Sequence, residues 1–365
     1  MIDSGDPGDP VLVAPTPRPA RQPARSSEVL LEIVGLTKRF PVRRSWAEML
    51  RSPGRSRRVV AVDAVTCSIA RGEFFGLLGA NGAGKTTIFK LLSTLIVPDE
   101  GTARVAGFDL RSQPEGVRSI LTPVIADERS LNWRLSAEEN LRLFAAFHGL
   151  AGEAAERHLR DLLAVVGLQD ARHKVVGAFS SGMKQRLLLA RALVSTPRVL
   201  LLDEPTRSLD PIAARDFRLF LKDDIVGRQG CTVLLATHNS EEVLDLCDRV
   251  GVLDRGRMIA VGTPADLSHR VSGVRYRVWT DTPEHPAFRA LDETSGLTPL
   301  THVVDPDGWK VVELTLTGDG AQPAEVLGSL VRSGVSVARF ERVQAPLAEL
   351  IEDLMRSNPP GSSDA

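Results

Sequence analysis

An excess of charge of either sign is absent from this sequence of 365 residues. Its 45 lysines and arginines are balanced by 46 aspartates and glutamates, which leaves a formal net charge of −1. A balanced chain has no overall field that would attract nucleic acid, so any charged partner must be bound locally. We therefore expect no nucleic-acid partner.

Cysteines and long apolar runs are also scarce. Cys67, Cys231 and Cys247 are odd in number and far apart, so they offer neither a disulfide framework nor a metal-binding cluster. A reducing compartment is the simplest interpretation. No apolar run approaches the ~18 residues of a membrane-spanning helix, and the N-terminus lacks the pattern of a secretion signal. We expect that the chain neither spans a membrane nor leaves the cell by itself.

The length suggests roughly two domains, and the composition indicates where they begin and end. Residues 1–27 are rich in proline and poor in apolar side chains, which is typical of a disordered tail. Residues 28–267 read as an α/β domain and residues 268–357 as a small α+β accessory domain. Residues 358–365 form a second predicted disordered tail.

The α/β domain is predicted from apolar runs that alternate with helix-length segments. The runs predict strands of a largely parallel sheet covered by helices, at 29–34, 59–69, 73–79, 198–204, 231–237 and 249–254. A helical insert is expected at about 111–178. In the accessory domain, we expect a helix at 323–334 and strands at 274–280, 309–318 and 335–343.

The most informative stretch is "GANGAGKTT", which follows a buried run and precedes a helical one, as the G-x-x-x-x-G-K-[ST] phosphate loop requires. Glycines let backbone N–H groups turn toward phosphates, the lysine reaches the β- and γ-phosphates, and the first threonine can ligate Mg²⁺. The alternative is a chance glycine-rich turn. The predicted binding residues are Gly79, Ala80, Asn81, Gly82, Ala83, Gly84, Lys85, Thr86 and Thr87.

Three acid–base residues follow two further strands. Asp203 ends the run "RVLLLD" and is the candidate for the metal side, next to Thr86. Glu204 is then placed to polarise a water, which separates hydrolysis from phosphoryl transfer to a substrate. His238 follows "CTVLLAT" and could contact the γ-phosphate. A solvated strand end and a structural histidine are the alternatives.

Taken in order, these motifs resemble the ATP-binding cassette (ABC) ATPases over residues 28–267. The phosphate loop, the acidic pair, the "SLD" that ends at Asp210 and the histidine all match, and "FSSGMKQR" corresponds to the family's signature, usually LSGGQ. The resemblance implies that a second copy presents its signature, Ser180, Ser181 and Gly182, to the bound ATP. It also implies that Phe40 stacks on adenine, although an aromatic at a strand end can equally be a core residue.

Two departures from the family pattern stand out. Ser181 and Met183 occupy signature positions that are usually glycine and glutamine, but a serine there still offers its backbone N–H and a hydroxyl. The second departure is that no glutamine occurs in "VIADERSLNWRL", where the family has one. Asp127 or Glu128 could supply the oxygen instead, and Asp127 is our candidate for a further metal ligand.

The family resemblance implies a function. The chain is expected to bind and hydrolyse ATP with Mg²⁺, to pair with a second copy, and to drive a separate membrane permease from the cytoplasmic face of the membrane. The ending "PLAELIEDL" is similar to that of drug exporters of the daunorubicin-resistance type, which favours export, although the accessory domain could serve only for packing. The alternative is a soluble ABC ATPase that acts as a mechanical or regulatory clamp without a permease.

One segment of the cassette is unusually basic. "FPVRRSWAEMLRSPGRSRRVV", at 40–60, carries six arginines, and its Trp46, Met49 and Leu50 would share one face of a helix. A short basic amphipathic helix suits an anionic membrane surface or the cytoplasmic end of the membrane partner. The alternative is a solvated loop.

Overall fold

The computed structural model describes residues 28–41, 58–125, 130–271, 274–288, 297–304, 308–316 and 323–343. Several sequence predictions lie outside these ranges. They are the two tails, most of the basic segment (42–57), Asp127, Glu128 and the C-terminal motif at 346–354.

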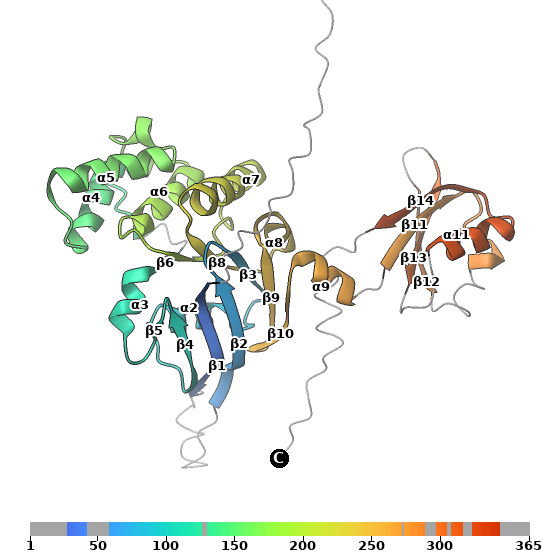
Figure 1. The fold of residues 1–365 in the computed structure, drawn as a ribbon. Helices are drawn as coiled ribbons and strands as arrows, with labels where there is room; N and C mark the ends of the chain where they lie inside the picture. The colour runs from blue at the N-terminus through green and yellow to red at the C-terminus, as the bar shows by residue number, and fades with distance from the viewer. Residues whose placement is uncertain are drawn as a thin grey trace, which may run out of the picture.

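The centre of the cassette is a six-stranded sheet (Figure 1). In spatial order its strands are β10 (Arg257–Gly262), β9 (Arg249–Asp254), β3 (Phe74–Leu78), β8 (Thr232–Thr237), β7 (Val199–Asp203) and β6 (Leu121–Ile125). All neighbours are parallel except β10, which runs antiparallel to β9. Because parallel strands end at the same edge, the residues that follow β3, β7 and β8 meet there.

The first two predicted strands belong to a separate sheet, so the expectation of one largely parallel sheet was wrong for them. This antiparallel sheet contains, in spatial order, β2 (Arg58–Ala70), β1 (Val29–Pro41), β4 (Glu100–Val105) and β5 (Phe108–Asp109). The physical reason shows in β1, where buried and exposed residues are mixed, whereas β3 is buried throughout. A half-exposed strand suits an antiparallel sheet, and a continuously apolar strand suits the parallel one.

Two apolar cores lie on opposite faces of the central sheet. On one face, Leu77 packs in a cluster with Ile33 of β1 and with Ile88 of helix α2 (Lys85–Leu92). On the other face, alternate residues of the same strands, such as Leu200 of β7, join a cluster formed with the helices. These cores fix α2 against the end of β3.

The helices of the second core include the predicted helical insert, which is green to yellow in Figure 1. Its main helices are α4 (Ala137–Phe147) and α5 (Gly152–Val165), and α6 (Ser181–Leu193) follows beyond the expected end at residue 178. The start of α4 is a capping box, in which Ser136 Oγ accepts from Glu139 N at 3.2 Å and the Glu139 carboxylate accepts from Ser136 N at 2.8 Å. Amphipathic spacing therefore placed α4 and α5 correctly, and a side-chain cap is present at α4 but not at α5.

The expected range of the insert, 111–178, also contains elements of the sheet region. Helix α3 (Pro114–Ile120) leads into β6, which pairs in parallel with β7. The sequence "LTPVI" is short and contains Pro123, which argues against a central strand, but β6 lies at the edge of the sheet, where proline is tolerated. In the described residues the insert thus begins after β6.

The remaining helices of the cassette cover the second core or follow the last strand. They are the 3-10 turns Gln169–Ala171 and Val176–Ala178, α7 (Pro211–Phe220) with its π-helical continuation Leu221–Arg228, α8 (Ser240–Leu246) and α9 (Pro264–Val271). Within the described ranges, no helix combines the length and the apolar character needed to cross a membrane.

The C-terminal residues form a small antiparallel sheet with its own helix, as expected. In spatial order the elements are β12 (Leu297–Val304), β13 (Lys310–Leu316), β11 (Val274–Thr280) and β14 (Val337–Val343), with helix α11 (Pro323–Arg332). Strand β12 had not been expected. Val278, Leu314 and Leu330 are fully buried in a core that belongs to this unit. A separate core is typical of a separate unit. Leu267, where the predicted cassette range ends, lies within α9 and is buried in the core of the cassette.

Candidate functional site

The phosphate loop joins the end of β3 to the start of α2. Its conformation requires glycine at two positions. Gly84 has a φ of 107°, and a Cβ atom there would lie 2.4 Å from the carbonyl oxygen of Ala61. A Cβ atom on Gly79 would lie 2.3 Å from the carbonyl oxygen of Leu253. Neighbouring backbone carbonyl groups therefore lie close to the loop on two sides and leave no room for a side chain at either glycine.

Helix α2 begins without a side-chain cap. Gly84 stands at the N-cap position and has no side chain that could accept a hydrogen bond from the first turn. The N–H groups at the start of a helix carry a partial positive charge and bind anions readily. The absence of a capping side chain leaves this helix end available to a phosphate group.

Lys85 is held inside the loop by its own backbone. Its Nζ donates to the carbonyl oxygens of Gly79, at 2.6 Å, and Ala80, at 3.0 Å, and the residue is only 6% exposed. Burial lowers the pKa of Lys85, and the nearby carboxylates of Glu204 and Asp203 act in the opposite direction. The ammonium group is thus fixed beside the position that a phosphate would take.

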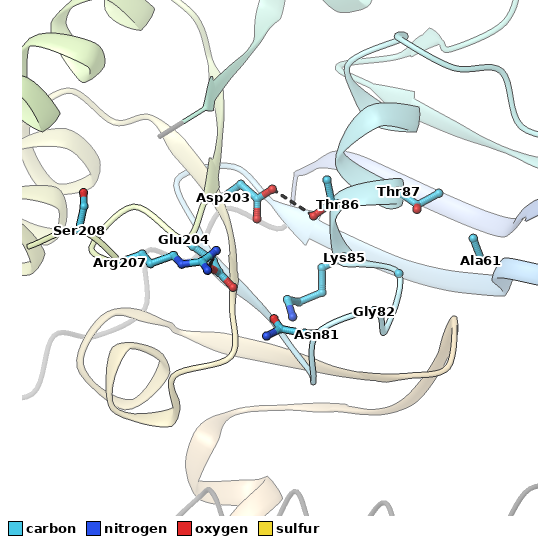
Figure 2. A pocket seen from close by; sticks show the side chains of 11 residues that line it. Ala61, Asn81, Gly82, Lys85, Thr86, Thr87, Asp203, Glu204, Arg207 and Ser208 are labelled. Carbon is cyan, nitrogen blue, oxygen red and sulfur yellow. Dashed lines mark hydrogen bonds and ion pairs between the residues drawn. The ribbon is translucent and has the colours of Figure 1, made fainter. Parts of the chain in front are cut away.

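Asp203 is the last residue of β7, and it faces the first turn of α2. Thr86 Oγ1 donates to Asp203 Oδ2 at 3.2 Å (Figure 2). Burial raises the pKa of Asp203, while the hydrogen bond from Thr86 counteracts this effect. A hydroxyl and a carboxylate are the hard oxygen ligands that Mg²⁺ prefers, and Mg²⁺ usually takes only one or two protein carboxylates. The two residues therefore fit a magnesium ion.

Glu204 follows Asp203 and contacts the end of β8, the residue His238 that follows β8, and Arg207 of the next turn. Its backbone N–H donates to Ala236 O at 2.9 Å, which ties it to the end of β8, and its φ is 46°. Its two carboxylate oxygens have different partners: His238 Nδ1 lies 2.8 Å from Oε1, and Arg207 Nη1 lies 3.1 Å from Oε2. A non-glycine residue at positive φ is uncommon and is held by its surroundings. Each carboxylate oxygen therefore has a partner of its own, and the backbone of Glu204 is fixed separately.

These side chains surround a pocket of about 600 Å³. Figure 2 shows Glu204 and Arg207 on one side, with Asp203 between them and the phosphate loop. The lining residues are Ala61, Asn81, Gly82, Gly84, Lys85, Thr86, Thr87, Asp203, Glu204, Arg207 and Ser208. A neighbouring cavity of about 350 Å³ includes His238, and Glu204 and Arg207 line both.

Several residues predicted for the site do not line the larger pocket. Phe40 is 37% exposed on β1, and Lys38 Nζ lies 5.6 Å from the centre of its ring. Asp210 caps α7 by accepting from Ile212 N at 3.1 Å and Ala213 N at 2.9 Å. Among the loop residues, Ala83 is buried, and its N–H donates to Ala80 O at 3.1 Å, so both shape the loop.

The signature residues lie at the start of α6, away from this pocket. Ser180 is the N-cap, and its Oγ accepts from Met183 N at 3.3 Å. Ser181 and Gly182 form the first turn and are partly exposed. Asp127 and Glu128, the candidates to replace the missing glutamine, lie outside the described residues and stay predictions.

Sequence reasoning missed Ala61 and Arg207 of the pocket, and it included Ser208 only as part of the "SLD" motif. Ala61 comes from β2 and reaches the phosphate loop only through the packing of the two sheets. Arg207 and Ser208 lie three and four residues after Glu204. An arginine three residues after Glu204 was a signal that could have been noticed, because a tight turn brings such residues together; Arg207 N in fact donates to Glu204 O at 3.2 Å.

The parallel sheet, the glycine-rich loop at the end of β3 and the acidic pair at the end of β7 define a P-loop nucleotide-binding protein. The model of the ABC transporter family matches residues 62–207. The daunorubicin/doxorubicin resistance ATP-binding protein DrrA of Streptomyces peucetius is 34% identical over 292 residues, which cover 80% of this chain and 86% of that protein. The chain therefore belongs to the ABC transporter family, among its ATP-binding ATPase proteins.

Two further comparisons agree. The probable multidrug ABC transporter ATP-binding protein YbhF of Escherichia coli is 41% identical over 207 residues, which cover 57% of this chain but only 35% of YbhF. The chain thus spans about a third of that relative. The solved structure of cbiO1 from Clostridium perfringens matches 73% of this chain and 96% of its own, with a TM-score of 0.57 and 24% identity. That likeness confirms the cassette fold.

Proposed function

We propose that this chain binds and hydrolyses ATP to drive the export of a substrate through a separate membrane-spanning partner. The observation that carries the hydrolytic part is the 2.8 Å contact between Glu204 Oε1 and His238 Nδ1 at the edge of the phosphate pocket. A carboxylate oriented by a histidine beside a phosphate site is the arrangement that a general base for water requires.

Each residue of the pocket has a role in this proposal. Lys85 and the N–H groups at the start of α2 bind the β- and γ-phosphates. Thr86 and Asp203 hold Mg²⁺, which when bound offsets the charge of the phosphates. Glu204 accepts a proton from the attacking water, and His238 holds the carboxylate in place and contacts the terminal phosphate.

A second copy of the chain completes the site in our proposal. Ser180, Ser181 and Gly182 are exposed or partly exposed at the start of a 13-residue helix, yet they do not line the pocket of their own chain. A helix start of this kind can bind the phosphates of a nucleotide held by another copy. Asp210 would lie at the same junction, and Phe40 would stack on the adenine ring.

The names of the relatives support an exporter. DrrA of Streptomyces peucetius is named for resistance to daunorubicin and doxorubicin, and YbhF is named as a probable multidrug transporter protein. The structure of cbiO1 is described as part of a transporter complex, cbiONQ. We propose by analogy a permease partner and a location on the cytoplasmic face of the membrane.

Co-expression tests the proposal. The tagged chain is produced together with a candidate partner that has several membrane-spanning helices, and the detergent-solubilised complex is purified and reconstituted into vesicles. We expect the two chains to copurify and to move a drug such as daunorubicin across the vesicle membrane only with ATP and Mg²⁺. Copurification without ATP-dependent transport would contradict drug export. ATPase activity without copurification and without transport would favour a clamp that works without a permease.

A further inference from the structure

Arg207 is the charged residue of the pocket to which the proposed mechanism gives no role. Its side chain is 76% exposed and lies beside Glu204, across the pocket from Lys85 and Asn81 (Figure 2). It lines both the phosphate pocket and the neighbouring cavity with His238. The guanidinium group therefore stands where the two cavities meet.

The contact between Arg207 and Glu204 is easily exchanged. The Nη1 to Oε2 distance is 3.1 Å, but the arginine side chain is largely exposed, and ion pairs that are exposed to water contribute little to stability. Glu204 does not depend on this contact for its orientation, because His238 holds the other carboxylate oxygen and the backbone is tied to Ala236. The arginine can thus leave without releasing the carboxylate from its position.

The charges of the pocket favour a contact between Arg207 and an incoming phosphate group. Lys85 and Arg207 balance Asp203 and Glu204 among the lining residues. A terminal phosphate that enters next to Glu204 brings further negative charge close to a carboxylate, and like charges at short distance repel. A guanidinium group binds phosphate through paired, charge-assisted hydrogen bonds, which are stronger than an exposed ion pair.

We propose that Arg207 recognises the terminal phosphate of a bound nucleoside triphosphate, exchanging its contact with Glu204 for one with the phosphate. This inference rests on the proposed function, because it assumes that the pocket binds ATP. Together with Lys85 and His238, Arg207 would then contribute to distinguishing a triphosphate from a diphosphate. It also frees one oxygen of Glu204 at the moment when the terminal phosphate is in place.

The test compares the affinities for two nucleotides. The full chain, with Mg²⁺, is titrated calorimetrically with ADP and with a triphosphate analogue whose β,γ-bridge is an imido group. We expect Arg207→Ala to raise the Kd of the triphosphate about tenfold while the Kd of ADP changes less than twofold. Arg207→Lys keeps the charge without the paired geometry, so it should recover part of the preference.

The matched control is Arg215→Ala, which removes an exposed arginine on α7 outside the lining residues and should leave both Kd values unchanged. An unchanged ratio of the two Kd values in Arg207→Ala would overturn the inference while ATP binding itself stands. A wild-type chain that binds neither nucleotide would instead refute the proposed function. An equal rise in the Kd of both nucleotides in Arg207→Ala would show that the arginine supports the pocket without recognising the terminal phosphate.

Discussion

Two helix starts in this protein carry sequences that are predicted to bind phosphate, and they are built differently. Helix α2 begins after Gly84 with no side-chain cap, and Lys85 is almost fully buried beside it. Helix α6 begins at Ser180, which is exposed and caps its own helix by accepting from Met183 N. The first start faces acidic residues of β7 and the following turn, whereas no residue of α6 lines the described pocket.

The difference separates residues that a single chain brings together at one pocket from residues that we propose act on the nucleotide of a second copy. At α2, the phosphate loop, the candidate metal ligands and the candidate base all meet at one edge of the sheet. At α6, Ser180 is exposed and the first turn is partly exposed, and none of these residues lines that pocket. We therefore expect substitutions at the first region to act on a single chain and those at the second to act on the dimer.

The largest effect is expected from Glu204→Gln, which removes the base but keeps the shape of the side chain. ATP turnover should fall by about 10²–10⁴, the contribution of a well-placed general base. ATP binding should persist, because the contacts of the phosphate loop remain. Steady-state phosphate release measures the turnover. Sedimentation in the presence of ATP should detect a closed dimer, because the variant binds ATP without hydrolysing it. Near-normal turnover would remove Glu204 from the role of base.

Lys85→Ala should have the next largest effect, and it should act on binding. The substitution removes a cation that is fixed beside the expected phosphates, so we expect the Kd of ATP to rise about 10- to 100-fold. Calorimetric titration of the purified chain measures this change, with circular dichroism as the check that the chain still folds. If ATP affinity is unaltered in a folded variant, the phosphate-loop assignment fails.

Ser180→Ala should have the smallest effect on a single chain and should sharpen the comparison most. Loss of an N-cap lowers the free energy of unfolding by about 1 kcal/mol. Ser136→Ala is the matched control, because it removes the N-cap of α4, a neighbouring helix of the same insert. Both variants should lose similar stability in thermal unfolding and bind ADP normally.

Only Ser180→Ala should also lower ATP turnover, because only that serine is proposed to reach the nucleotide of a second copy. Turnover measured over a range of protein concentrations distinguishes the two variants. Equal turnover in Ser180→Ala and Ser136→Ala would indicate that the signature serine serves only as a helix cap.

Much of the fold was readable from local patterns. Continuous apolar runs identified β3, β7 and β8, because strands buried on both faces are apolar along their whole length. Amphipathic spacing identified α4 and α5, because a helix buried on one face repeats apolar residues every three to four positions. The assignment of β1 and β2 to the central sheet was wrong, because the sequence of a strand does not specify which strand it pairs with. Strand β6 was missed because five residues with a proline give almost no pattern.

The sequence by itself determined which chemistry is present: a glycine-rich loop with Lys85 and Thr86, and an acidic pair after an apolar strand. These are local features, and their spacing alone restricts what they can bind. Only the tertiary structure decided which of them meet. Parallel pairing of β3, β7 and β8 places Glu204 2.8 Å from His238, although 34 residues separate them, and sheet packing brings Ala61 against Gly84. Such contacts depend on long-range packing, which no short stretch of sequence encodes.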